Sequence, residues 1–346
     1  MYDIGCPVNW LGRAPHGVDP GRTAPFTIHG RRCPMSRFRV VVTDQVFPDV
    51  ERERAYLAEI DAELVVADGD REAVLALAED ADALLNTYFA MDPEAIGRLR
   101  RCRIIARYGI GVDNIALDAA RQAGIIVTNV PDYSVDEVAT HTLAMLLALL
   151  RKLPTGDATV RGGGWGVAAL RPLRRPSHLT VGLIGFGRIG RRVAELLAPL
   201  GCRLLVHDPY VPQVAGAEIV GLDQLLAEAD AVCLHSPLTE ETRGMVGPDE
   251  LARMRPSAVL VNTSRGPLVR LMALLDALRE GRLAGAALDV FEEEPPDPAM
   301  LKGVENLLVT PHVAYYSEEA IAESQRKAAL QVRKALVGEA VDYQVN

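Results

Sequence analysis

The sequence predicts an α/β protein built on two doubly wound parallel sheets. Short, almost continuously apolar strand-like segments alternate with helical segments along most of the 346-residue chain. Parallel strands that are covered by helices on both faces have this pattern. A Gly-X-Gly-X-X-Gly motif also stands between a strand and a helix at residues 185–190. The length is enough for two domains, each with its own core.

The first α/β series begins at Arg37, where the apolar periodicity begins. Its predicted strands cover residues 37–44, 63–68, 82–88, 103–109 and 124–130. Helical spacing of apolar residues lies between them, at 49–60, 70–80, 92–101 and 117–124. The alternation predicts a parallel sheet with helices on both faces.

A long helix is expected next. Ser134 and Glu137 have the spacing of a capping box at the start of the apolar segment 135–153. The helix is apolar on most faces, so we expect it to be buried between the domains. The following stretch, 161–177, is rich in Gly, Arg and Pro and breaks regular structure.

A second series of strands and a final helix complete the chain. The strands are predicted at 181–185, 203–208, 231–236, 258–264, 285–291 and 306–311, and the helix at 318–338. We expect this helix to return to the first domain. The predicted limits are 35–134 plus 315–346 for one domain, which is discontinuous, and 135–314 for the other.

Composition excludes several classes of function. The net charge is -9 with no long basic run, which argues against nucleic acid or an anionic membrane as the main partner. The five cysteines lack metal-ligand spacing, so we expect no metal site and a reducing, cytoplasmic location. Residues 1–34 lack a secretory signal, and we expect a disordered leader; too early a start codon and a functional tail are the alternatives.

The glycine motif indicates a nucleotide site. Gly185 permits a tight turn, Gly187 lets the backbone approach a pyrophosphate, and Gly190 allows the helix to pack closely on the strand. Free N–H groups at the helix N-terminus favour phosphate. Asp208 ends the next strand, where a carboxylate binds the ribose hydroxyls of NAD and repels the 2′-phosphate of NADP. The alternatives are a glycine-rich turn of another α/β domain and a capping role for Asp208.

Polar residues at three strand ends suggest acid–base chemistry. Arg265 follows one strand, glutamates 292–294 follow the next, and His312 follows the last. The carboxyl ends of parallel strands meet at the ligand-binding edge of such a sheet. A histidine can donate a proton to a ketone that accepts hydride, an arginine can polarise its carbonyl, and a glutamate can orient the imidazole. Each residue alone has a structural explanation, such as a packed histidine.

These residues strongly resemble those of the D-isomer specific 2-hydroxyacid dehydrogenases, from Arg37 to the C-terminus. The resemblance rests on "GIGVDNI" (109–115), "GFGRIG" (185–190), "NTSRGPLV" (262–269), "GAALDVFEEEPP" (285–296) and "TPH" (310–312). It implies two Rossmann-like or flavodoxin-like domains with the active site in the cleft between them. It also implies an NAD-dependent enzyme that interconverts 2-keto acids and D-2-hydroxy acids, and a homodimer.

The family's site residues can be placed on this sequence. The catalytic set implied is Arg265, Glu294, selected because it directly precedes the proline, and His312. The cofactor contacts implied are Gly185, Gly187, Arg188, Ile189, Gly190, Asp208, Thr263 and Asp289. The "GIGVDNI" loop implies that Ile110 and Gly111 bind the substrate carboxylate through backbone N–H groups.

Within the family, the sequence is most similar to the C-terminal binding protein branch. That likeness implies that Arg107 approaches the substrate carboxylate and that Tyr315, in place of the branch's Trp, lines the pocket. With Tyr88, these residues suggest a substrate side chain larger than that of glyoxylate. Arg270 stands where the family usually has a helix-capping Asp, so we expect an altered helix start.

Two alternative functions stay open. One is an NAD(H)-sensing corepressor or scaffold, as in the C-terminal binding proteins. The other is oxidation of D-3-phosphoglycerate, which is weakened because no regulatory domain follows the last helix. A glutamate rather than a glutamine at position 294 argues against formate as the substrate.

Overall fold

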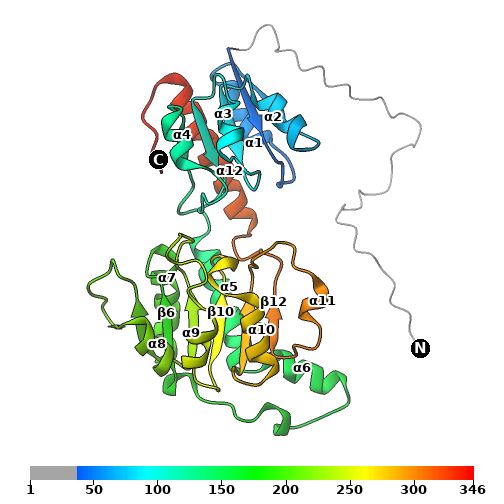
Figure 1. Ribbon diagram of the computed structural model, residues 1–346, viewed down its shortest axis with the longest axis vertical. Helices are drawn as coiled ribbons and strands as arrows, with labels where there is room; N and C mark the ends of the chain where they lie inside the picture. The colour runs from blue at the N-terminus through cyan, green and yellow to red at the C-terminus, as the bar shows by residue number, and fades with distance from the viewer. Residues whose placement is uncertain (1–36) are drawn as a thin grey trace, which may run out of the picture. The chain divides into compact units, whose positions relative to one another are not determined.

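The computed structural model describes residues 37–346, so the predicted leader lies outside the described residues. The described chain forms two α/β lobes, each around one sheet (Figure 1). All strand pairings in both sheets are parallel. The predicted fold class is therefore confirmed.

The first lobe contains a five-stranded sheet of order β2-β1-β3-β4-β5. Its strands are β1 (Phe38–Val42), β2 (Ala62–Val66), β3 (Ala83–Asn86), β4 (Ile104–Arg107) and β5 (Ile126–Thr128). Its helices are α1 (Glu51–Ala58), α2 (Arg71–Ala78), α3 (Pro93–Gly97), α4 (Leu117–Gln122) and the C-terminal α12 (Glu318–Val337). Every strand predicted from residues 37–130 is present.

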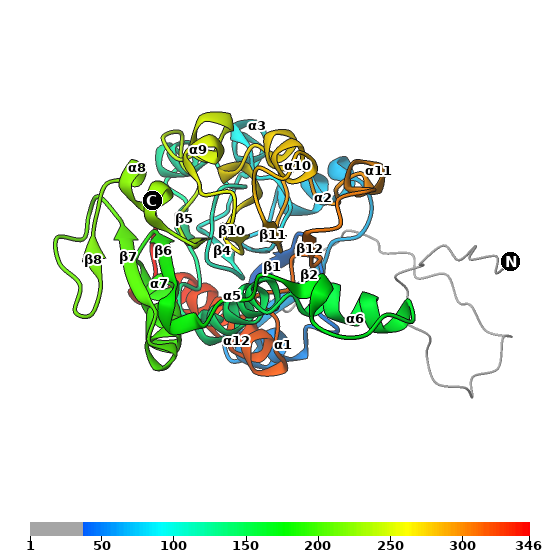
Figure 2. The same cartoon turned by 90° about the horizontal axis from the view of Figure 1, so that it is seen from below.

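Helices cover both faces of this sheet because successive strand residues point to opposite sides. Val40 and Ile104 pack with Leu57 of α1 and Val332 of α12, and these two helices lie side by side in Figure 2. The opposite face packs against α2, α3 and α4. The last helix therefore packs on the first sheet.

The second lobe contains a seven-stranded sheet of order β12-β11-β10-β9-β6-β7-β8. Its strands are β6 (Thr180–Ile184), β7 (Arg203–His207), β8 (Glu218–Ile219), β9 (Ala231–Leu234), β10 (Val259–Asn262), β11 (Gly285–Leu288) and β12 (Leu307–Val309). The two-residue β8 was not predicted. The domain limits given above remain a prediction.

Helices also sandwich the second sheet. Its helices are α5 (Val135–Leu150), α6 (Leu153–Arg161), α7 (Arg188–Leu197), α8 (Leu222–Glu228), α9 (Pro248–Arg253), α10 (Leu271–Arg279) and α11 (Pro298–Leu301), with 3-10 turns η1 (Ala168–Leu170), η2 (Pro176–His178), η3 (Ala198–Leu200) and η4 (Gly266–Leu268). One face packs against α5 and α7, the other against α8, α9 and α10. The expectation that α5 is buried between domains was wrong, because its apolar face, including Leu146, packs on the seven-stranded sheet.

The predicted capping box at the start of α5 was also wrong. Ser134 is the N-cap residue, but its side chain makes no capping hydrogen bond. Glu137 instead accepts a hydrogen bond from the Ser317 hydroxyl at 2.7 Å, and Ser317 caps α12. A contact between residues 180 positions apart has thus replaced the local one.

Helix α10 begins without a local side-chain cap, as expected from Arg270. Its first N–H, at Leu271, donates to Glu292 Oε2 at 3.0 Å, and Arg270 pairs with the same carboxylate at 3.7 Å. A carboxylate from another loop therefore supplies the negative charge that favours a helix N-terminus.

Replacing Glu292 by alanine is expected to lower the free energy of unfolding by about 1 kcal/mol, because the N-terminus of α10 loses its acceptor. Urea denaturation measures the change. Glu293→Ala is the matched control, since no hydrogen bond or ion pair of Glu293 is found within residues 37–346. Equal losses in both variants would contradict the capping role.

No helix among residues 37–346 is long and apolar enough to span a membrane. The same described residues contain no cluster of His, Cys, Asp and Glu that could hold a metal ion.

Candidate active site

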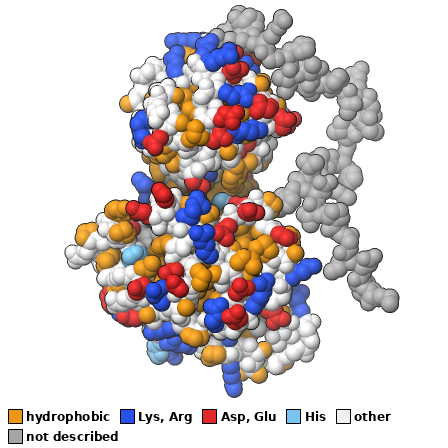
Figure 3. All heavy atoms as spheres, viewed as in Figure 1, with side chains coloured by type: hydrophobic (Ala, Val, Ile, Leu, Met, Phe, Trp, Pro, Cys, Tyr) orange, Lys and Arg blue, Asp and Glu red, His pale blue; other side chains and the backbone are white. Residues whose placement is uncertain are grey.

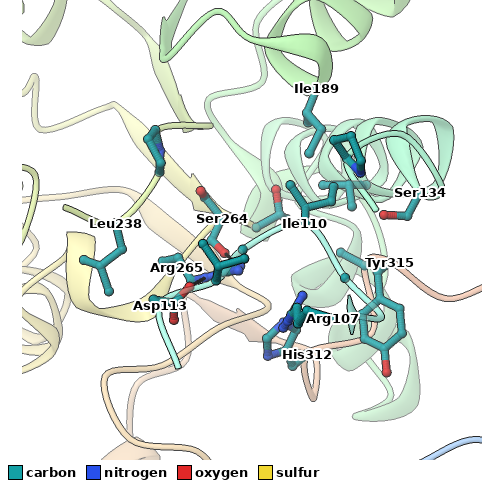
Figure 4. A pocket seen from close by; sticks show the side chains of 18 of the residues that line it. Arg107, Ile110, Asp113, Ser134, Ile189, Leu238, Ser264, Arg265, His312 and Tyr315 are labelled. Atoms are coloured by element: carbon teal, nitrogen blue, oxygen red, sulfur yellow. Dashed lines mark hydrogen bonds and ion pairs between the residues drawn. The ribbon is translucent and has the colours of Figure 1, made fainter. Parts of the chain in front are cut away.

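Residues from both lobes line one cavity of about 630 Å³. The molecule is hollowed between the lobes, with charged side chains at the hollow (Figure 3). The first lobe contributes Arg107 at the end of β4 and the loop that follows it, including Gly111. The second lobe contributes Ile189, Arg265 and His312. Figure 4 shows the side chains of Arg107, Ile189, Arg265 and His312 around the cavity.

His312 and Glu294 form a close polar pair at this cavity. His312 Nδ1 lies 2.6 Å from Glu294 Oε2, and Glu294 Oε1 accepts the Phe291 N–H at 2.9 Å. Burial would raise the pKa of Glu294, but the hydrogen bond and the charge of His312, with the Phe291 N–H, together lower that pKa. The carboxylate fixes the imidazole, which leaves Nε2 available to exchange a proton with a ligand.

Asp289 fixes the backbone of the histidine loop. Its carboxylate accepts the N–H groups of Val313 and Ala314, both at 2.9 Å, and the Thr310 hydroxyl at 2.5 Å. Its carbonyl accepts the His312 N–H at 2.8 Å. His312 has a φ of 53°, an unfavourable value for a non-glycine residue. These bonds hold it there, so the carboxylate expected to contact the cofactor is already engaged by protein donors.

Arg265 is held at the cavity by Asp113, a residue that was not predicted as part of the site. The Arg265 Nε donates to Asp113 Oδ1 at 2.9 Å, and Nη1 donates to the Ser264 carbonyl at 2.9 Å. Burial would raise the pKa of Asp113, but Arg265 lowers it. A Cβ on Gly111 would lie 1.6 Å from Arg265 Nη2, so glycine there leaves room for the guanidinium.

Arg107 ends β4 beneath the same loop. Its Nε is buried, and no hydrogen-bond partner for it is found within residues 37–346. Burial, and then the charge of Arg265, lower the pKa of Arg107, but a guanidinium remains charged in proteins. The N–H groups of Ile110 and Gly111 likewise have no acceptor among the described residues. Both features suit an anionic ligand.

Tyrosines surround the histidine. The Tyr315 ring lies 6.0 Å from the His312 ring and 6.4 Å from that of Tyr133, while Tyr88 lies 6.1 Å from His312. All line the cavity. Tyr133 was missed in the sequence because nothing but its place beside Ser134 marked it.

The glycine motif forms a cradle that a phosphate group can enter. Gly185 has a φ of 92°, and a Cβ there would lie 2.6 Å from the His235 backbone. A Cβ on Gly190 would lie 2.4 Å from the Gly185 carbonyl oxygen. Gly187 is the N-cap of α7, so free N–H groups point outward from the helix start. This geometry fits a dinucleotide.

Of the other predicted cofactor contacts, three line the cavity and Asp208 does not. Arg188, Ile189 and Thr263 line the cavity, and the Thr263 hydroxyl lies 2.7 Å from that of Thr142. Asp208 does not line it. Its carboxylate accepts the Phe186 N–H at 2.7 Å and the Tyr210 N–H at 2.9 Å, which places it directly beside the glycine loop.

His235 was missed and also lines the cavity. Its Nε2 is buried without a hydrogen-bond partner within the described chain, and burial lowers its pKa to about 4. The imidazole is therefore neutral near pH 7. The sequence signal was a histidine at the end of a predicted strand, as for His312, but without a neighbouring acid.

His235, whose Nε2 is buried, predicts a decline of stability in acid. The unfolded chain takes up the proton near pH 6.5 and the folded chain only near pH 4, so stability falls as the pH drops between these values. The loss from pH 7 to pH 5 is about 2 kcal/mol. We expect His235→Gln to remove most of this loss in urea denaturation, while the exposed His178→Gln leaves it. An unchanged pH dependence in His235→Gln would contradict the prediction.

Residues 143–314 match the family model for "D-isomer specific 2-hydroxyacid dehydrogenase, NAD binding domain". A glyoxylate reductase of Aeropyrum pernix is 37% identical over 317 residues, which cover 88% of this chain and 93% of that protein. A D-3-phosphoglycerate dehydrogenase of Methanocaldococcus jannaschii is 36% identical over 89% of this chain and 59% of its own length. The chain spans 53–59% of the first curated relatives it matches.

Among solved structures, a D-lactate dehydrogenase of Aquifex aeolicus complexed with NAD and lactic acid has a TM-score of 0.79. It is 27% identical, and the match covers 87% of this chain and 96% of that one. The likeness to the C-terminal binding protein branch stays a prediction. With a relative matched over nearly its whole length and a family model over residues 143–314, the chain belongs to the D-isomer specific 2-hydroxyacid dehydrogenase family.

Proposed function

We propose that this protein is an NAD-dependent oxidoreductase that interconverts a 2-keto acid and a D-2-hydroxy acid. The pairing of His312 Nδ1 with Glu294 at 2.6 Å, in the cavity that Arg265 also lines, carries the proposal. It is an oriented proton donor beside a cation. Glyoxylate reductases and a D-lactate dehydrogenase among the relatives support the same chemistry.

Each residue at the cavity has a separate role in binding the substrate or in proton transfer. The N–H groups of Ile110 and Gly111, with Arg107, hold the substrate carboxylate. Arg265 polarises the keto oxygen, and protonated His312 donates a proton to it as negative charge develops. Neutral His312 accepts this proton in the reverse direction, and Glu294 keeps the imidazole oriented. NAD, when bound, supplies or accepts the hydride.

On the cofactor side, we assign phosphate binding to the glycine motif and the N-terminus of α7, with Gly185, Gly187 and Gly190 making room. Arg188 and Ile189 begin α7, and Thr263 lines the cavity nearby. Asp208 is assigned to the ribose. Residues 135–314 then form the NAD-binding domain, and 35–134 with 315–346 form the substrate-binding domain.

We also propose a cytoplasmic homodimer. Large apolar side chains are exposed along the segment that begins with α6, and Trp165 is 90% exposed. The others are Leu153, Val160, Val167 and Leu173. A second copy that covers this segment would remove them from water. Light scattering should give twice the mass of one chain. The free thiols of Cys102, Cys202 and Cys233 fit a reducing compartment.

Loss of NADH absorbance with a panel of 2-keto acids tests the proposed function. The panel extends from glyoxylate and hydroxypyruvate to longer aliphatic and aromatic acids. Turnover of at least one acid, with formation of the D-hydroxy acid, is the expected result. Tight NADH binding without turnover of any acid would overturn the enzyme proposal in favour of an NAD(H)-sensing scaffold.

Tyr315→Ala is expected to change the ranking among these keto acids, because the ring forms the wall next to His312. We expect kcat/KM for acids with large side chains to rise about tenfold relative to kcat/KM for glyoxylate. This is the scale of one or two methylene contacts. The ratio of kcat/KM values measures it. An unchanged ranking would remove Tyr315 from the substrate pocket.

A further inference from the structure

We infer that the substrate of this site is a 2-keto acid with a single negative charge and an uncharged side chain, rather than a dicarboxylic or phosphorylated keto acid. The inference rests on the proposed function and specifies its substrate class. It follows from the charges and walls of the cavity.

The charges that face the cavity leave at most one positive charge for the substrate. Arg107, Arg265 and protonated His312 are the positive groups. Asp113 is 2.9 Å from Arg265, and Glu294 is 2.6 Å from His312, so each of these carboxylates neutralises one of them. Three positive groups and two negative groups leave a net charge of one positive unit, which one substrate carboxylate neutralises.

Arg107 is the cation that this balance leaves without a partner. No ion pair of Arg107 is found within the described residues, and its Nε is buried and unsatisfied. A buried unpaired charge is costly, so a substrate carboxylate near Arg107 is stabilised in return. A second anionic group would find no equivalent partner.

The remaining charges at the cavity do not change this result. Asp289 also lines it and adds one negative charge, which the one positive charge of Arg188 offsets. Arg188 is the remaining arginine among the described lining residues, and it lies at the start of α7, where the cofactor phosphates are placed. Lysine is absent from the described lining.

The walls around His312 are neutral. Partial burial and the neighbouring Tyr315 raise the pKa of Tyr88, and burial raises the pKa of Tyr133 to about 12. Neither hydroxyl therefore ionises near pH 7. A side chain that extends from the keto carbon would meet the rings of Tyr133 and Tyr315, which favour an uncharged group.

Matched substrate pairs provide the first test. Hydroxypyruvate and 3-phosphohydroxypyruvate differ by the phosphate, and 2-oxopentanoate and 2-oxoglutarate differ by one carboxylate. We expect kcat/KM to favour the singly charged member of each pair at least about tenfold, because an uncompensated charge in a cavity of low dielectric is unfavourable. Preference for the multiply charged members would overturn the inference while leaving the proposed dehydrogenase activity intact.

Binding provides a second test that does not require turnover. Oxamate and oxalate have nearly the same shape but carry one and two negative charges. Titration into the protein with NADH should show tighter binding of oxamate. Tighter binding of oxalate would overturn the inference even if every keto acid in the panel were inert, which would count against the proposed function separately.

A charge-adding variant distinguishes charge from shape. Tyr315→Arg places one more cation beside His312, so the preference within each matched pair should shift toward the multiply charged member by at least about tenfold. Tyr315→Gln is the neutral control and should leave the ratio within each pair unchanged. Equal ratios in the two variants would show that charge does not set the selectivity.

Discussion

Replacing His312 by alanine is expected to lower kcat for keto-acid reduction by about 10²–10⁴-fold, the usual contribution of a positioned acid or base. The Glu294 carboxylate holds the imidazole in place at 2.6 Å. KM should change much less, since Arg107, Ile110 and Gly111 are unaffected. NADH absorbance measures the rates, and quenching of protein fluorescence verifies that NADH still binds.

Glu294→Gln is the control for His312→Ala, because it weakens the support of the imidazole without removing the imidazole itself. The amide can still hydrogen-bond to Nδ1 but no longer stabilises the protonated imidazole, so kcat should fall by less than in His312→Ala. Undiminished turnover in His312→Ala would remove the histidine from the chemistry. A larger loss in Glu294→Gln than in His312→Ala would assign the proton transfer to the carboxylate instead.

Asp289→Ala is expected to have the largest effect on stability. Its carboxylate is 1% exposed and accepts hydrogen bonds from Thr310, Val313 and Ala314. Removing it leaves the buried Ala314 N–H and the partly buried Val313 N–H without an acceptor and takes one partner from the Thr310 hydroxyl, a loss of about 2–4 kcal/mol in the free energy of unfolding. Since the same bonds hold His312 at its positive φ, kcat should also fall, by about tenfold or more.

Two variants separate the contributions of Asp289. Thr310→Val removes one of the three donors and should cost about 1 kcal/mol. Asp289→Asn keeps one acceptor oxygen, so its free energy of unfolding should lie between those of the wild type and Asp289→Ala. Urea denaturation gives the stabilities. If Asp289→Ala weakens NADH binding alone, with stability and kcat retained, the residue belongs to the cofactor site rather than to the loop.

The sequence predicted every strand except the two-residue β8, and most of the candidate site, because both are encoded locally. Buried parallel strands are apolar on both faces, so segments such as 258–264 stand out in the chain. Arg265 and His312 lie directly after such strands, and the resemblance selected Glu294. The structure places His312 and Glu294 in contact.

The features that were missed depend on contacts between distant residues. Asp113 pairs with Arg265, 152 positions away, and Glu137 binds Ser317 rather than Ser134. Glu292 caps α10 from another loop. A capping or pairing side chain is identified by what approaches it in three dimensions, and spacing along the chain does not reveal that approach.

The position of α12 on the first sheet has a consequence for the order of folding. Val40, Leu85 and Ile104 lie on the face that α12 covers, but this helix is synthesised more than 200 residues after β4. The seven-stranded sheet, whose elements are nearly contiguous, can form while that face is still open to water. Contacts of long sequence separation form slowly and expose apolar surface in the meantime. The first lobe leaves the ribosome first but completes its packing last, when α12 covers its sheet. The chain is most vulnerable to aggregation before α12 packs on that sheet.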